Sequence, residues 1–123
     1  MRKIVHTDMA PAAIGPYSQA IDTGNTLYQS GMLGVDPVTG VLAEGIVEQT
    51  KQIIKNIDNL LKAAGYSKDD VVKTTCFIAD MGDFATFNEI YGAYFTSKPA
   101  RSCVAVKTLP KNALAEVEVI AVK

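Results

Sequence analysis

The stretch from Ile46 to Ala64 constrains the fold more than any other feature of the sequence. Its apolar residues recur in steps of three and four, and Gly65 follows as a stop signal. The repeating positions are Ile46, Ile53, Ile57, Leu60, Leu61 and Ala64. This spacing predicts an amphipathic helix over residues 46–64 that buries one face.

Strand-like segments lie on both sides of this helix. They combine β-branched and aromatic residues with alternating polarity. The segments are residues 17–22, 27–32, 71–79, 101–107 and 115–123. The first two flank Thr23-Gly24-Asn25-Thr26, whose Gly-Asn centre favours a tight hairpin turn with positive φ. Residues 36–40 (Asp-Pro-Val-Thr-Gly) form a second predicted turn.

A second helix is expected to start at Asp83 as its cap and to end near Pro99. It carries an aromatic stripe made of Phe84, Phe87, Ile90, Tyr91, Tyr94 and Phe95. Such a stripe at helical spacing is more often core than a ligand-binding surface, and we interpret it as core.

The predicted order of elements is βββαβαββ, which favours an α+β fold. We expect a two-layer sandwich in which a mixed β-sheet carries two helices on one face. In the last strand Val117, Val119 and Ala121 alternate with Glu116, Glu118, Ile120 and Val122. Apolar residues on both faces of the sheet predict oligomerisation.

Composition limits the functional classes. The 123 residues fit one domain over 1–123, and no apolar run approaches the roughly 20 residues of a membrane span. The N-terminus lacks the apolar stretch of a signal peptide, so a cytoplasmic location is expected. Twelve basic and 13 acidic residues argue against nucleic acid as the main partner. A local basic patch from Lys51, Lys55 and Lys62 is less favoured than a solvated helix face.

Metal chemistry is not expected. Cys76 and Cys103 are too few for a disulfide framework or a four-thiolate site, and His6 is the only histidine. His6 stands alone near the terminus, with neither an acid nor a thiol assigned to it as a catalytic partner, so we interpret it as structural. The sequence therefore predicts neither a metal nor a cofactor.

Arg101 and Glu116 are the first candidates for a role in substrate binding or catalysis. Arg101 begins a strand, and its planar fork matches a carboxylate in two parallel hydrogen bonds, although a surface ion pair is the ordinary alternative. Glu116 lies in an otherwise apolar strand that we expect to pair with the strand of Arg101. Its carboxylate can hold and deprotonate a water molecule, or it can be an ordinary exposed glutamate of the sheet. Cys103 shares the face of Arg101 and is read as a small hydrophobe, not a nucleophile.

Three residues near the N-terminus offer polar groups to a ligand. Tyr17 and Ser30 supply hydroxyls, and Gly31 lets a backbone amide approach closely. On composition alone they are ordinary strand and turn residues.

Together these pieces resemble a known family. The matching motifs are GPYSQA at 15–20, QSGMLGVDPVTG at 29–40, NEIY at 88–91, PARSCVAV at 99–106 and LPKNALAEVEVIA at 109–121. They extend nearly from end to end, and a glutamate fifteen residues after the arginine of PARSC is specific. The sequence is similar to the RidA/YjgF family of imine deaminases.

The resemblance implies a chorismate-mutase-like homotrimer with active sites between subunits. It implies a cofactor-independent hydrolase that converts 2-iminobutanoate and 2-iminopropanoate to 2-keto acids and ammonia. By motif, Arg101 would bind the substrate carboxylate and Glu116 would position water. The other implied site residues are Tyr17, Ser30, Gly31, Asn88 and the Cys103 backbone.

Two other functions remain open at this point. One is an endoribonuclease or translation inhibitor, which the charge balance and the lack of a histidine pair disfavour. The other is a non-enzymatic module that binds 2-keto acids through Arg101. Binding without turnover would distinguish it from the enzyme.

Overall fold

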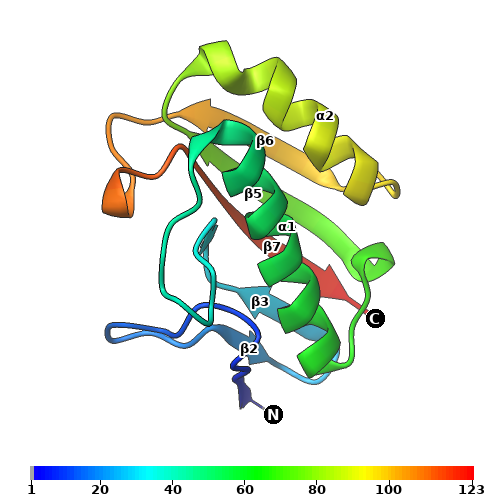
Figure 1. The fold of residues 1–123 in the computed structure, drawn as a ribbon. Coiled ribbons are helices and arrows are strands. Elements are labelled where there is room, and N and C mark those ends of the chain that lie inside the picture. Colours follow the sequence, from blue (N-terminus) through cyan, green and yellow to red (C-terminus); the bar gives the residue numbers. More distant parts are fainter. Residues whose placement is uncertain (1) are drawn as a thin grey trace.

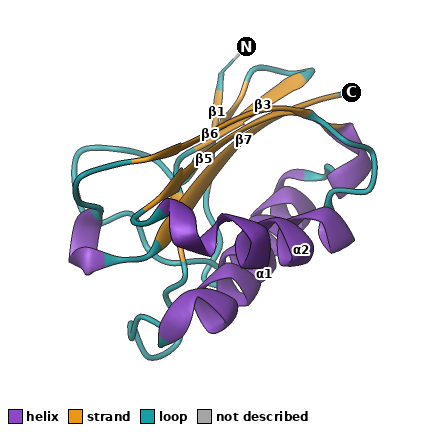
Figure 2. Cartoon of the chain, turned by 90° about the horizontal axis from the view of Figure 1, so that it is seen from above, coloured by secondary structure: helices purple, strands orange, loops and turns teal. Residues whose placement is uncertain are grey.

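The computed structural model describes residues 2–123, which form a seven-stranded mixed sheet and two helices (Figure 1). The strands are β1 (Lys3–Val5), β2 (Ala20–Asp22), β3 (Thr26–Gln29), β4 (Met32–Leu33), β5 (Val71–Ile78), β6 (Ala100–Ala105) and β7 (Ala115–Val122). The helices are α1 (Gly45–Ala64) and α2 (Phe84–Tyr94). Figure 2 shows both helices on the same side of the sheet. The predicted two-layer α+β sandwich is confirmed.

The strand order differs from the prediction in one respect. The sheet runs β1-β2-β3-β7-β5-β6, and β4 also pairs with β7. The expectation that β6 and β7 pair directly is wrong, because β5 lies between them. The chain crosses from β5 through α2 to a parallel β6, and a crossover of this kind places the new strand on the free edge of β5. The next segment must then pass β5 to form β7.

The core lies between the helices and the inner face of the sheet. From α1 it takes Ile53, Ile57, Leu60 and Leu61, and from β7 Val117, Val119 and Ala121. The alternation read from the sequence of β7 is therefore confirmed. Phe87 and Tyr91 of α2 and Phe95 directly after it are also buried, so the centre of the aromatic stripe is core. Gly65 ends α1 in the left-handed conformation, with φ 81°.

Several element boundaries depart from the expected ones. Residues 17–19 are loop, and the segment 27–32 is divided into β3 and β4 at Ser30-Gly31. Both predicted turns are present, with positive φ at Gly24 and Gly40. Asp83 precedes α2, but its side chain makes no capping bond.

The outer face of the sheet, opposite the helices, exposes large apolar side chains. The exposed fractions are 64% for Ile4, 49% for Tyr28, 47% for Val104 and 40% for Val122. Exposed apolar area of this kind is typical of an interaction surface.

Among residues 2–123, neither helix is long and apolar enough to cross a membrane.

Candidate active site

A cleft of about 780 Å³ opens where β4 and the start of β7 meet the loops that flank the sheet. Its polar lining includes Tyr17, Ser30, Gly31, Glu116 and Glu118. The rest of the lining is mostly apolar and comes from the loops around residues 11–14 and 33–37. The structure therefore brings together four residues expected from the sequence, Tyr17, Ser30, Gly31 and Glu116.

Glu116 is the half-buried carboxylate of this cleft. Burial, together with the negative charge of Glu118, raises the pKa of the Glu116 carboxyl. Gly31 packs directly against it: a Cβ at position 31 would lie 2.8 Å from Glu116 Cδ. Only glycine leaves room for the carboxylate in this position. A carboxylate of raised pKa in a cleft is suited to general acid–base chemistry.

Ser30 and Tyr17 differ in how firmly they are held. The Ser30 hydroxyl donates to Ser18 O at 2.6 Å, and the Ser30 amide donates to Gln19 O at 2.9 Å. This hydroxyl can therefore offer a ligand only its acceptor lone pairs in the present geometry. Tyr17 is 52% exposed and lines the mouth of the cleft.

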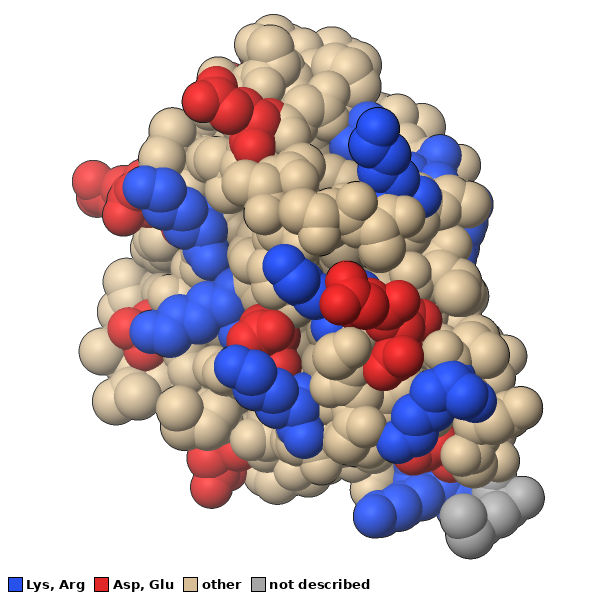
Figure 3. All heavy atoms as spheres, turned by 90° about the vertical axis from the view of Figure 1, so that its right-hand side faces the viewer, with Lys and Arg blue, Asp and Glu red and all other residues tan. Residues whose placement is uncertain are grey.

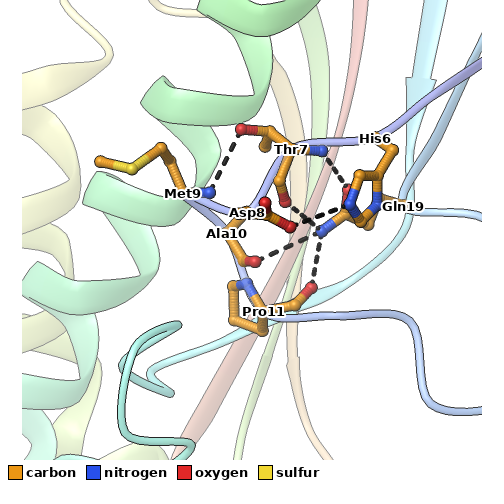
Figure 4. A network of polar contacts seen from close by, with 7 residues as sticks. All are labelled: His6, Thr7, Asp8, Met9, Ala10, Pro11 and Gln19. Atoms are coloured by element: carbon orange, nitrogen blue, oxygen red, sulfur yellow. Dashed lines mark hydrogen bonds and ion pairs between the residues drawn. The ribbon is translucent and has the colours of Figure 1, made fainter.

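The loop that forms one wall of the cleft is organised by a single buried amide, that of Gln19 (Figure 4). Gln19 Oε1 accepts a hydrogen bond from Thr7 N at 2.8 Å. Gln19 Nε2 donates to the backbone oxygens of Thr7 at 3.0 Å, Ala10 at 3.3 Å and Pro11 at 2.8 Å. These bonds satisfy backbone groups that have no strand partner, and they fix the path of residues 7–11.

A second buried amide holds the opposite wall. Asn56 of α1 donates to the backbone oxygens of Leu33 at 3.0 Å and Val35 at 2.9 Å. The turn that follows is closed by Asp36, whose carboxylate accepts from Val38 N at 2.8 Å. Gly34 lets this segment approach α1, because a Cβ there would lie 2.6 Å from Gln49 O.

Arg101 lies elsewhere, on the edge strand β6. Its Nη1 donates to Asn88 Oδ1 at 2.7 Å, and its Cζ lies 4.8 Å from the centre of the Tyr91 ring. Burial raises the pKa of the nearby Cys103 thiol although Arg101 opposes the shift. The thiol is therefore protonated at neutral pH, which disfavours a nucleophilic role. Arg101, Asn88 and Cys103 form a second group of expected residues.

The two groups face opposite sides of the sheet. Arg101 is in register with Thr74 of β5, and Glu116 is in register with Phe77. Side chains alternate along a strand, so positions three residues apart point to opposite faces. The expectation that Glu116 lies near Arg101 across a shared ladder is wrong within one protomer.

Residue-by-residue reading of the sequence missed Gln19 and Asn56. Asn56 carries a signal, because it lies on the apolar face of α1 with Ile53 and Leu60, and a polar amide there indicates a buried side chain that bonds backbone. Gln19 lies in a loop and carries no such signal. His6, read as structural, is exposed and lies 3.1 Å from Asp8 Oδ1 through its Nε2. Among residues 2–123 no three His, Cys, Asp or Glu side chains are grouped so as to hold a metal ion.

Comparisons with known proteins agree over the whole chain. The model of the family described as Endoribonuclease L-PSP matches residues 7–123. The 2-iminobutanoate/2-iminopropanoate deaminase of Mus musculus is 51% identical over 125 residues, covering 100% of this chain and 93% of the relative. A Rid family protein of Yersinia pestis, described as of unknown function, has a solved structure with a TM-score of 0.97, 48% identity and full coverage of both chains. The structure of E. coli TdcF with bound serine has a TM-score of 0.95 and 42% identity, with 98% of each chain covered.

Proposed function

Because the chain belongs to the Endoribonuclease L-PSP family, the RidA/YjgF family that its motifs resemble, we propose that it is a 2-iminobutanoate/2-iminopropanoate deaminase. It hydrolyses reactive imines formed when amino acids are dehydrated, and it releases a 2-keto acid and ammonia without a cofactor. The proposal includes the cytoplasmic location expected from the sequence.

The observation that carries the proposal is that the carboxylate and the arginine needed for the reaction belong to two separate groups of residues. One group holds a carboxylate, Glu116, in a cleft next to Gly31, and the other holds an anion-binding arginine, Arg101, on the edge strand. Both are needed for hydrolysis of an anionic imine, and one protomer presents them on opposite faces. A second copy of the chain must therefore complete each site.

We expect a homotrimer with three sites between subunits. The exposed apolar side chains on the outer face of the sheet give such an assembly a surface to bury. In this arrangement β6 of one subunit brings Arg101 and Cys103 to the Glu116 cleft of its neighbour, and α2 brings Asn88.

Each residue then has a role in the proposed reaction. Arg101 binds the substrate carboxylate through two parallel hydrogen bonds, while the backbones of Cys103 and Gly31 help to hold it. Glu116 orients water and removes its proton as the oxygen attacks the imine carbon. The imine nitrogen is protonated before the attack, and Glu116 passes the proton taken from water to the nitrogen of the resulting carbinolamine. The C–N bond then breaks while the hydroxyl group loses its proton and becomes the keto oxygen, and the nitrogen leaves as ammonia.

Tyr17 and Ser30 line the cleft of Glu116, and Asn88 holds Arg101 through its hydrogen bond to the guanidinium. Imines of this kind already hydrolyse in water, so orientation of the two reactants accounts for the acceleration that is needed. The related TdcF structure contains serine, a small molecule with a carboxylate of the kind that Arg101 is proposed to bind.

An endoribonuclease is the alternative that the family description raises. RNA binding depends on clustered positive charge, whereas acidic and basic side chains are interspersed on the face in Figure 3. Cleavage of RNA by nuclease-free protein, lost in Arg101→Ala, would favour this alternative.

The test of the proposed function is a competition for the imine. Threonine and a threonine dehydratase generate 2-iminobutanoate in the presence of semicarbazide, with and without this protein. We expect the wild-type protein to divert the imine to 2-ketobutyrate before semicarbazide traps it, and Arg101→Ala not to. Unchanged trapping by the wild-type protein would contradict the proposal, and binding of 2-ketobutyrate without turnover would favour a binding module.

A further inference from the structure

The aromatic side chains of α2 extend beyond the core and reach the guanidinium of Arg101. Arg101 Cζ lies 4.8 Å from the centre of the Tyr91 ring and 5.6 Å from that of Phe84. At this range a ring attracts a guanidinium electrostatically and offers it a flat supporting surface. Part of the aromatic stripe therefore contacts the residue proposed to bind the substrate.

Tyr91 is held firmly at both ends of its side chain. Its hydroxyl lies 2.6 Å from Thr74 Oγ1, and Thr74 is fully buried on the neighbouring β5. Its ring packs against Phe95, with the ring centres 4.5 Å apart, and against Phe87 at 5.8 Å. The buried hydrogen bond fixes the hydroxyl end of the side chain, and the neighbouring rings pack against the ring itself, so Tyr91 is a rigid support.

Arg101 is constrained from a second direction. Its Nη1 donates to Asn88 Oδ1 at 2.7 Å, which occupies one of the five N–H groups that a guanidinium has. The amide fixes the guanidinium at one corner, and the Tyr91 ring lies beside it. The remaining N–H groups are left to meet an anion as a parallel pair.

We propose that Tyr91 is a positioning residue for carboxylate recognition. Its ring, anchored by Thr74, holds the Arg101 guanidinium in the orientation that presents its free N–H pair to a small 2-imino or 2-keto acid. The identity of the substrate rests on the proposed function. Tyr91 does not touch the substrate and acts through Arg101.

The first test compares Tyr91→Leu, which removes the ring, with Tyr91→Phe, which keeps it. For Tyr91→Leu we expect the Kd of 2-ketobutyrate, measured by calorimetry, and the KM of the imine to rise on the order of tenfold. The kcat should change far less, because the carboxylate is bound in the ground state and the transition state alike. Tyr91→Phe keeps the ring but loses the hydroxyl contact with Thr74, so its Kd should rise several-fold, less than for Tyr91→Leu.

The matched control is Phe87→Leu. Phe87 is a fully buried aromatic residue of the same helix and packs against Tyr91, but it is not among the rings near Arg101. Phe87→Leu should lower the free energy of unfolding at least as much as Tyr91→Leu does, and it should leave Kd and KM near the wild-type values. An equal rise of Kd in Tyr91→Leu and Phe87→Leu would overturn the proposal, since the effect would then be one of general stability.

A second pair of variants decides the matter if Tyr91→Leu does not fold. Thr74→Val removes the anchor of the Tyr91 hydroxyl, and Thr74→Ser retains it. We expect a several-fold higher Kd for the valine variant alone, and equal Kd values in both variants would overturn the proposal. The binding readout is separate from turnover. A wild-type protein that binds 2-ketobutyrate without hydrolysing imines would refute the deaminase while leaving this test intact.

Discussion

Arg101 and Glu116 lie on opposite faces of one sheet, separated by the intervening strand β5. Arg101 pairs with Thr74 and Glu116 with Phe77, and this odd separation along β5 sends the two side chains in opposite directions. Within one protomer, the guanidinium proposed to bind the substrate carboxylate and the Glu116 carboxylate proposed to bind water therefore cannot reach the same small molecule.

Arg101→Lys should separate the effect of the positive charge at position 101 from the effect of the guanidinium geometry. Lysine keeps the positive charge but loses the planar fork and the bond to Asn88. We expect a loss of about 2 kcal/mol, or on the order of 30-fold in kcat/KM for the imine. Steady-state kinetics with the semicarbazide competition measure this, and activity equal to the wild type would show that a point charge is sufficient.

Gly31→Ala should reduce activity without disturbing the core. The added Cβ would lie 2.8 Å from Glu116 Cδ, so the carboxylate must move. A displacement of about 1 Å at a reacting group costs on the order of 100-fold in rate, and we expect a loss of this size in kcat/KM.

The control is Gly92→Ala on α2, where an added Cβ meets nothing within 4 Å. This variant should keep full activity and gain up to about 1 kcal/mol in the free energy of unfolding. If Gly31→Ala keeps full activity as well, the close packing of Gly31 against Glu116 has no catalytic importance.

Glu118→Gln should shift the pH dependence of the reaction. After burial, the charge of Glu118 is what raises the pKa of the Glu116 carboxyl. Glu116 must be ionised to take a proton from water, so activity falls as the pH drops through its pKa. Without the neighbouring charge this pKa falls, and the acid limb of kcat/KM against pH should move to lower pH. A limb that stays in place or moves upward would contradict the coupling of these two carboxylates.

Gln19→Leu should loosen the wall of the cleft. The amide makes hydrogen bonds to Thr7, Ala10 and Pro11, and its loss leaves buried backbone groups unpaired. We expect the free energy of unfolding to fall by about 2 kcal/mol or more in urea titrations, with a higher KM. Asn59→Ala is the control, because it removes one exposed bond to Met9 O in the same loop. A similar small effect of both variants would contradict the role given to Gln19.

The sequence predicted the elements whose pattern is local. Spacing alone gave the helix over 46–64 and the inward face of β7, because an amphipathic element repeats its polarity whatever it packs against. The pairing of β6 was predicted wrongly. Which strand lies beside which depends on how α2 carries the chain across the sheet, and no local pattern records that path.

The residues of the site were named by resemblance to a family, whereas their arrangement needed the structure. Alternation along each strand is readable, but the faces of Arg101 and Glu116 can be compared only once both strands are in register with β5. Gln19 was overlooked because a polar residue in a loop carries no sign of burial until the loop folds around it.

Complementation between two inactive variants tests whether each active site is shared between subunits. Arg101→Ala and Glu116→Ala subunits are unfolded, mixed in equal amounts, refolded together and assayed for imine hydrolysis. If each site takes Arg101 from one subunit and Glu116 from its neighbour, random mixing leaves about one quarter of all sites intact, and activity should return to about that fraction of the wild type. Activity no higher than that of the separate variants, in trimers shown to contain both subunits, would contradict a site shared between subunits.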